Sequence, residues 1–169
     1  TTLNSVNAMR TRRLDGVRAV YAQEEGTSVQ VFARDITPLE ELNDIGIEHR
    51  VGYELTMECL KRSSRISGIV AVNDSVAYGV LDAILESGAR VPEDYSLCGF
   101  DNIYPSHFSR VGLTTVEHHI AEKGRSALEM LHNRITSGPG CSITRVEVMP
   151  ELVVRSSTGP APVQRQAGG

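Results

Sequence analysis

Residues 68–102 read GIVAVNDSVAYGVLDAILESGARVPEDYSLCGFDN, and this stretch decides the fold. It opens at 68–72 with a continuous apolar run, which is typical of a strand covered on both faces. Apolar residues then recur at helical spacing over 76–85, until Gly88 ends the helix. Residues 95–100 predict the next strand. A strand, a helix and a strand in this order predict a βαβ unit with parallel pairing.

The same alternation extends in both directions along the chain. The predicted elements before this stretch are a helix over 5–25, a strand over 29–33 and a helix over 46–63. Those after it are a strand over 113–116, a helix over 120–135 and, at 143–148 and 152–154, a pair of short strands or one bent strand. The sequence therefore predicts an α/β fold of three layers, a mostly parallel sheet with helices on both faces. Residues 159–169 predict a disordered tail.

The composition is that of an ordinary globular protein, with 40% hydrophobic and 22% charged residues. The net charge of −4 argues against a surface that follows a phosphate backbone. The one basic cluster, Arg10, Arg12 and Arg13, therefore indicates a helix surface or a ligand contact rather than nucleic-acid binding. An apolar run of about 18 residues is missing, so we expect no contact with a membrane.

Signatures of catalysis and of metal binding are missing from the sequence. It has no GxSxG elbow, no HExxH, no phosphate-binding loop and no GxGxxG after a strand, so we expect neither an enzyme nor a cofactor. His118 and His119 are adjacent and should point to different faces, so we expect no shared metal ion. The cysteines lack CxxC spacing and are predicted to be reduced, mostly buried thiols, as in a cytoplasmic protein: Cys59, Cys98 and Cys141.

Polar pairs follow two of the predicted strands. Asn73 and Asp74 follow the strand at 68–72, and Asp101 and Asn102 follow the strand that ends at residue 100. Ligands of open parallel sheets bind at the carboxyl ends of the strands, and amide and carboxylate groups there could hold the hydroxyls of a polyol. The alternative is local: Asp74 would be the N-cap of the next helix and Asn102 a turn residue.

Four segments together resemble the effector-binding domain of the lactose/galactose repressor family. They are residues 68–102, LTTV at 113–116, KGRSALEML at 123–131 and PELVVRSST at 150–158. The resemblance implies the fold of type I periplasmic sugar-binding proteins, in which two similar α/β subdomains enclose a cleft.

The resemblance also implies how the chain is divided. Residues 1–158 would be the C-terminal part of the effector-binding domain, with most of the C-terminal subdomain before residue 104. Residues 113–115 would cross over, and the helix over 119–137 would lie in the N-terminal subdomain. The rest of that subdomain, the first strand of the C-terminal subdomain and the DNA-binding headpiece are expected outside this chain.

The family's effector-binding positions fall on particular residues here. Arg13 matches the arginine of an R-x-x-G pattern, Asn73 the asparagine of the N-D motif, and Asp101 the aspartate of the G-[FY]-D motif. An arginine offers a fork of donors, a carboxylate accepts from two hydroxyls and an amide does either, which suits sugars and nucleobases alike. Ser5 is a further candidate contact. Phe100 could stack on the apolar face of a sugar or pack in the core.

The expected function follows from the same resemblance. The protein would be a cytoplasmic transcription repressor that senses a small molecule, a sugar or a related compound, and binds operator DNA through the headpiece. It would be a homodimer that uses the helix over 74–87 and the strand near Tyr95. The alternative is a periplasmic sugar-binding protein of a transporter, although the LTTV and PELVVRSST segments favour the repressors. A third hypothesis, an enzyme on this fold, needs a nucleophile or acid/base pair that the sequence does not reveal.

Overall fold

The computed structural model describes residues 8–24, 27–62, 66–103, 106, 111–137 and 142–161. The elements are α1 (Ala8–Tyr21), α2 (Pro38–Asn43), α3 (Ile47–Arg62), β1 (Gly68–Val70), α4 (Asp74–Glu86), β2 (Ser96–Cys98), β3 (Thr115–Glu117), α5 (Ile120–Ser137) and β4 (Glu151–Val153). β1 pairs parallel with β2, and β3 pairs antiparallel with β4. A parallel bridge between Cys98 and Thr114 joins the chain entering β3 to β2.

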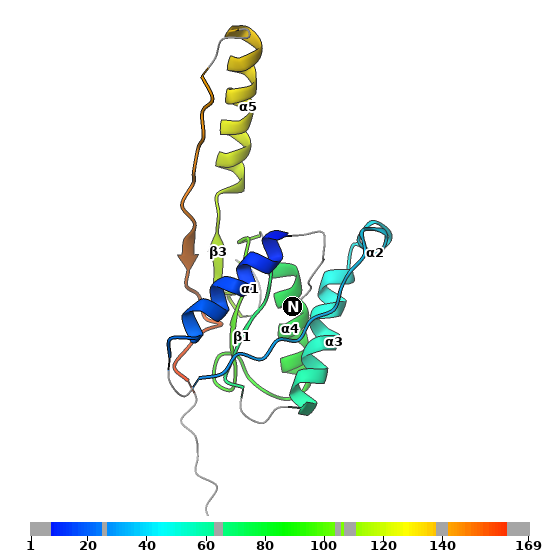
Figure 1. The fold of residues 1–169 in the computed structure, drawn as a ribbon. Helices are drawn as coiled ribbons and strands as arrows, with labels where there is room; N and C mark the ends of the chain where they lie inside the picture. Colours follow the sequence, from blue (N-terminus) through cyan, green and yellow to red (C-terminus); the bar gives the residue numbers. More distant parts are fainter. Residues whose placement is uncertain are drawn as a thin grey trace, which may run out of the picture.

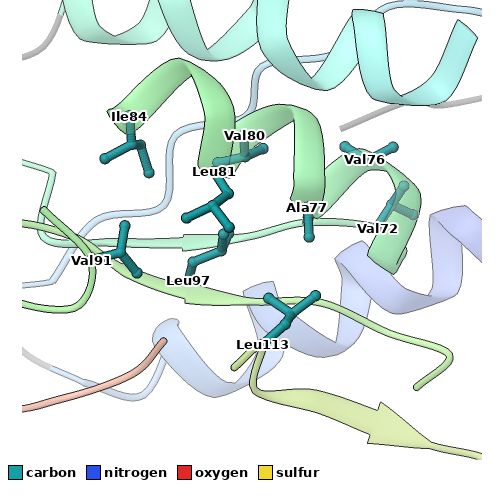
Figure 2. Packing of buried hydrophobic residues seen from close by; sticks show 10 residues of the cluster. Val72, Val76, Ala77, Val80, Leu81, Ile84, Val91, Leu97 and Leu113 are labelled. Carbon is teal, nitrogen blue, oxygen red and sulfur yellow. The ribbon is translucent and has the colours of Figure 1, made fainter. Parts of the chain in front are cut away.

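Helices cover both faces of the parallel strands. α4 lies between α3 and the strands on one face, and α1 lies on the other face (Figures 1 and 2). The predicted α/β architecture is therefore confirmed, although the antiparallel pairing of β3 with β4 was not predicted. None of the helices in the described part of the chain is long and apolar enough to cross a membrane.

The main core forms around α4, because this helix directs its apolar face at the strands (Figure 2). Gly88 adopts φ +83, which a residue with a side chain rarely does, and α4 has ended two residues before it. The buried members of this core are Ala71, Val72, Val76, Ala77, Val80, Leu81, Ile84, Val91, Leu97 and Leu113.

α3 and α4 approach each other closely at two glycines. A Cβ atom on Gly79 would lie 1.9 Å from the carbonyl oxygen of His49, and one on Gly52 would lie 2.3 Å from that of Val76. Any side chain at either position would overlap the backbone of the opposite helix. The two glycines therefore set the distance between α3 and α4.

α4 exposes little apolar surface in the described structure. The structure describes the helix in full, and of its large apolar residues only Leu85 is exposed. Val76, Val80 and Ile84 are buried inside the chain instead. α3 and the strands therefore cover most of the apolar face of α4, and the predicted homodimer contact on this helix stays a prediction.

α5 extends away from the packed helices and strands, together with the chain that follows it (Figure 1). No residue of α5 is buried, and its apolar residues Leu128, Leu131 and Ile135 are 68%, 55% and 72% exposed. The helix predicted over 120–135 is confirmed, but its apolar stripe has no cover in the described part of the chain.

The chain returns from α5 through β4 to the edge of β2. Ser157 is buried there: its Oγ accepts from the Thr114 N–H at 2.7 Å and donates to the Leu97 carbonyl at 2.6 Å. The PELVVRSST segment at 150–158 therefore leads from α5 back to β2. Gly159 is hydrogen-bonded to Ser96, while residues 162–169 of the predicted tail lie outside the described residues.

Two predicted strands are wrong. Residues 29–33 and 143–148 are extended but form no strand, because no neighbouring segment pairs with them among the described residues. β1 is also not covered on both faces, since Val70 is half-exposed. Apolar runs of this length indicate extended chain, but a strand also requires a partner from elsewhere in the fold.

The short helix α2 was missed, although the sequence carried a local signal for it. The Thr37 side chain accepts from the Glu40 N–H, and the Glu40 carboxylate accepts from the Thr37 N–H. Pro38 occupies the first turn, where its missing N–H costs nothing. A threonine followed three residues later by glutamate is a capping box, which predicts a helix start rather than only a turn.

Candidate functional site

The candidate site lies at the carboxyl ends of β1 and β2, beside α1. The Arg13 guanidinium reaches from α1: Nη1 donates to the Val72 carbonyl at 2.7 Å, and Nη2 lies 3.4 Å from Asp101 Oδ1. The Arg13 and Asp101 side chains remain 27% and 23% exposed. A fork of donors and a carboxylate therefore stand side by side on an accessible surface.

The Phe100 ring packs against the guanidinium of this pair. The Arg13 guanidinium carbon lies 3.7 Å from the centre of the Phe100 ring, a cation–π contact that fixes the plane of the guanidinium. The His118 ring lies against the same ring, with centroids 5.4 Å apart. Phe100 is half-buried and lies outside the main core. In the structure it contacts Arg13 and His118 rather than the main core, and stacking on a sugar face stays a prediction.

Asn73 is the N-cap of α4, a position for which Asp74 was the alternative considered above. Its Oδ1 accepts from the Val76 N–H at 2.9 Å, and its Nδ2 donates to Glu48 Oε2 at 2.9 Å. Glu48, in the first turn of α3, is also paired with Arg10 of α1. Asn73 rather than Asp74 caps the helix because the cap must adopt an extended conformation, and Asn73 is the extended residue before the first helical turn.

Asp74 is instead fully buried, and its carboxylate holds several segments of the chain together. Its carboxylate accepts from Thr115 Oγ1 at 2.6 Å, Ser106 Oγ at 2.7 Å and the Ile103 N–H at 3.0 Å. Each bond reaches a segment that follows β2 or enters β3. Burying a carboxylate is tolerated because these donors replace water. Asp74 therefore fixes the chain on either side of the candidate site.

The turn that carries Asp101 has a strained backbone. Asp101 adopts φ 113 and Asn102 φ 51, which side chains disfavour. Arg155 Nη2 donates to Asn102 Oδ1 at 2.7 Å, and Asn102 Nδ2 donates to Glu117 Oε2 at 2.9 Å. Asn102 is thus a turn residue, as considered above, and it also ties the turn to β3 and to the returning chain.

Burial and neighbouring positive groups act in opposite directions on the pKa of Asp101. Burial raises the pKa of Asp101 above its ordinary value of 3.8, although the Arg13 and His118 groups beside it act in the opposite direction. Hydrogen bonds from Asn102 and from the His119 backbone lower the pKa of Glu117. Asp101 is therefore a partly desolvated carboxylate, which a ligand hydroxyl could stabilise.

Two groups at the site, Glu48 and His118, were not predicted from the sequence. Glu48 accepts from Asn73 and is paired with Arg10, and His118 lies beside Asp101. His118 could have been found, because it follows the predicted strand at 113–116 just as Asp101 follows β2. Ser5 lies outside the described residues.

The adjacent histidines face different groups. His118 Nε2 lies 3.2 Å from Asp101 Oδ1, whereas His119 Nε2 lies 3.9 Å from Glu151 Oε1. In the described ranges no three histidine, cysteine or acidic side chains are gathered as a metal site. Cys59 is buried and Cys98 half-buried, and burial raises the pKa of both thiols. Cys141 lies outside the described residues.

A family model and curated proteins both match this chain. Residues 4–158 match the periplasmic binding protein-like domain. The chain is 39% identical over 106 residues to the "HTH-type transcriptional repressor PurR" of Mannheimia succiniciproducens, a match that covers 63% of this chain and 31% of that protein. It is 36% identical over 108 residues to the repressor of the same name from Haemophilus influenzae, with 63% and 32% covered.

Solved structures agree with these relatives. A LacI family transcriptional regulator from Enterococcus faecium with bound ribose superposes with a TM-score of 0.72 at 26% identity, over 92% of this chain and 53% of that one. A regulator of the same family from Arthrobacter sp. FB24, in complex with lactose, gives 0.67 at 29% identity, over 88% and 48%. The chain spans about a third of the curated relatives it matches and about half of these structures. It belongs to the periplasmic binding protein-like domain family, among the effector-binding domains of the lactose/galactose repressor family.

Proposed function

We propose that the chain is the ligand-sensing part of a transcription repressor and that its effector binds against Arg13 and Asp101. The observation that carries the proposal is the pairing of these two side chains at the carboxyl ends of the parallel strands. Phe100 and the Val72 carbonyl hold the guanidinium in place before any ligand arrives. Such preorganisation reduces the entropy that binding would otherwise cost.

The effector we propose is a sugar or a related small molecule. Asp101 would accept from two hydroxyls, and Arg13 would donate to a ring or hydroxyl oxygen. Of the two Asn73 amide hydrogens, the contacts among the described residues use one, so Asn73 remains a candidate contact. Ser5 is kept as a further candidate from the resemblance. The bound ribose and lactose in the matched structures support this class of ligand.

The other parts of the proposal concern the longer protein. With a net charge of −4, the chain itself is unsuited to gripping DNA, so operator binding is assigned to a headpiece outside it. The relatives named as repressors support a cytoplasmic, non-enzymatic protein, and we propose a homodimer. Residues 1–158 would form part of the effector-binding domain, and 159–169 a tail. An effector would change DNA binding only by binding one arrangement of the subdomains better than the other.

The test is a thermal-shift screen of the intact protein against sugars, sugar phosphates and nucleobases. A true effector should raise Tm by about 5 °C at concentrations about 100-fold above Kd. Asp101→Ala should weaken binding by more than about tenfold, because charge-assisted hydrogen bonds are lost. Asp15→Ala is the matched control, since it removes an exposed carboxylate from the helix that carries Arg13.

Two outcomes would overturn the proposal. An equal response of wild type and Asp101→Ala would place the ligand elsewhere. A ligand that binds through Asp101 but leaves operator DNA binding of the intact protein unchanged would favour the transporter-type binding protein instead.

A further inference from the structure

His118 occupies the two-residue connection between β3 and α5, and it touches the candidate site from that side. Its Nε2 lies 3.2 Å from Asp101 Oδ1, and its Nδ1 lies 3.2 Å from the Lys123 ammonium in the first turns of α5. Its ring rests against Phe100. One side chain therefore connects the carboxylate of the site with the helix that extends away from it.

The contacts define which nitrogen of His118 carries the proton. An ammonium group only donates hydrogen bonds, so Nδ1 must accept from Lys123. A neutral imidazole then has its proton on Nε2, the atom that faces Asp101. Nε2 is buried, and no aligned hydrogen-bond acceptor is present for it among the described residues. Asp101 Oδ1 is close enough to become that acceptor after a small rotation of the carboxylate.

We propose that His118 is a positioning residue for effector binding, which orients the Asp101 carboxylate and connects it through Lys123 to α5. This inference rests on the proposed function, because it assigns how the same site is held. The charged groups near the imidazole include Asp101 from the turn after β2, Arg13 from α1 across the Phe100 ring, Lys123 from α5 and Glu117 at the end of β3.

The distances around Asp101 Oδ1 indicate how His118 would position the carboxylate. Asp101 Oδ1 is shared between Arg13 at 3.4 Å and His118 at 3.2 Å, and both contacts are longer than a strong charge-assisted hydrogen bond. The carboxylate can therefore turn towards a ligand hydroxyl and lengthen one contact further. Any movement at the His118 end is transmitted to α5, because only His118 and His119 separate β3 from that helix.

Two substitutions in the intact protein separate the polar role of His118 from its packing role. His118→Phe keeps a ring against Phe100 but removes both polar contacts. His118→Gln loses the ring, yet its amide can accept from Lys123 and donate to Asp101. We expect His118→Phe to weaken binding of ribose or lactose about tenfold by titration calorimetry, and His118→Gln to stay within about threefold of wild type. The reverse order, or equal affinities, would overturn the proposal.

A second measurement needs no ligand. In ¹⁵N-edited spectra at about pH 8, where an ordinary imidazole is neutral, the His118 proton should reside on Nε2. The exposed substitution Lys123→Met should reduce that preference without altering the fold, because it removes the donor to Nδ1. A proton on Nδ1 in the wild type would contradict the inference. If no sugar binds, the proposed function fails, while this readout still decides whether His118 is held as described.

Discussion

Two regions of the molecule have equally clear helical patterns in the sequence but opposite environments in the structure. The body, formed by α3, α4, β1 and β2, buries residues such as Val51 and Ile84 completely. The arm, formed by α5 and residues 142–154, leaves Leu128 and Ile135 about 70% exposed (Figure 1). The comparison teaches that apolar spacing predicts a helix and its inner face, but not which segment will cover that face.

The matched structures are longer than this chain, which covers 53% and 48% of them. The resemblance assigns the helix over 119–137 to the N-terminal subdomain. That assignment remains a prediction, and the following substitutions contrast the body with the arm.

The largest effect is expected from Gly79→Ala in the body. The added methyl group would overlap the His49 carbonyl of α3, so α3 and α4 must separate. We expect a loss of about 4 kcal/mol or more in the free energy of unfolding, measured by urea denaturation. Gly124→Ala in α5 is the control: nothing lies within 4 Å of its Cβ position, and the helix should gain up to about 1 kcal/mol. Similar losses at both glycines would contradict the comparison.

A pair of leucine-to-alanine substitutions is expected to give the next largest effect on the free energy of unfolding. Leu97→Ala in β2 removes a fully buried side chain and should cost about 3 kcal/mol. Leu131→Ala in α5 should change the stability of the 169-residue chain by no more than about 0.5 kcal/mol, because the side chain is exposed. In the longer protein Leu131→Ala should cost about 2 kcal/mol if another segment covers the arm. An effect near zero there as well would mean that the arm stays uncovered.

A smaller effect is expected at the buried carboxylate of the body. Asp74→Asn replaces one accepting oxygen with a donor that faces the Ile103 N–H and Ser106. We expect a loss of about 2 kcal/mol by thermal or urea denaturation, because one buried N–H loses its partner. Asp82→Asn on the exposed side of α4 should cost about 0.5 kcal/mol or less. Equal costs would show that the buried hydrogen bonds are not formed.

The smallest effect concerns the pH dependence of stability. The raised pKa of Asp101 means that the folded state binds this proton more tightly than the unfolded chain. Its contribution is therefore most favourable at low pH and falls as the pH rises above the ordinary carboxyl value of 3.8. The lowered pKa of Glu117 acts the other way: its contribution is present above 4.5 and is lost as the pH falls. Denaturation of Asp101→Asn and Glu117→Gln between about pH 3 and pH 7 should show slopes of opposite sign relative to wild type. Slopes of the same sign would contradict the assigned environments.

Much of the fold could be predicted from the sequence, because the relevant signals are local. Apolar periodicity identified α3, α4 and α5, and Gly88 marked the end of α4. The capping box at Thr37 is an equally local signal, although the sequence analysis predicted no helix there. The segment over 29–33 misled the prediction because its β-forming residues have no partner strand among the described residues.

The site could be predicted only in part. Arg13 and Asp101 were chosen by resemblance, and the structure brings them together. Asn73 is a cap bonded to Glu48, and no spacing in the sequence relates that pair. His118 is brought to Asp101 because β3 lies alongside the chain that leaves β2.

The sequence by itself determined the order of helices and strands and the polar residues at the strand ends, because spacing, caps and turns act over a few neighbouring residues. The tertiary structure decided which apolar faces are covered, which residue caps α4 and which side chains meet at Asp101. Those outcomes depend on the distance between backbones, such as the close contact at Gly79, and on hydrogen-bond partners up to about ninety residues away, as between Arg13 and Asp101. Local sequence patterns do not specify such partners, since packing and hydrogen bonding are satisfied only when the whole chain has folded.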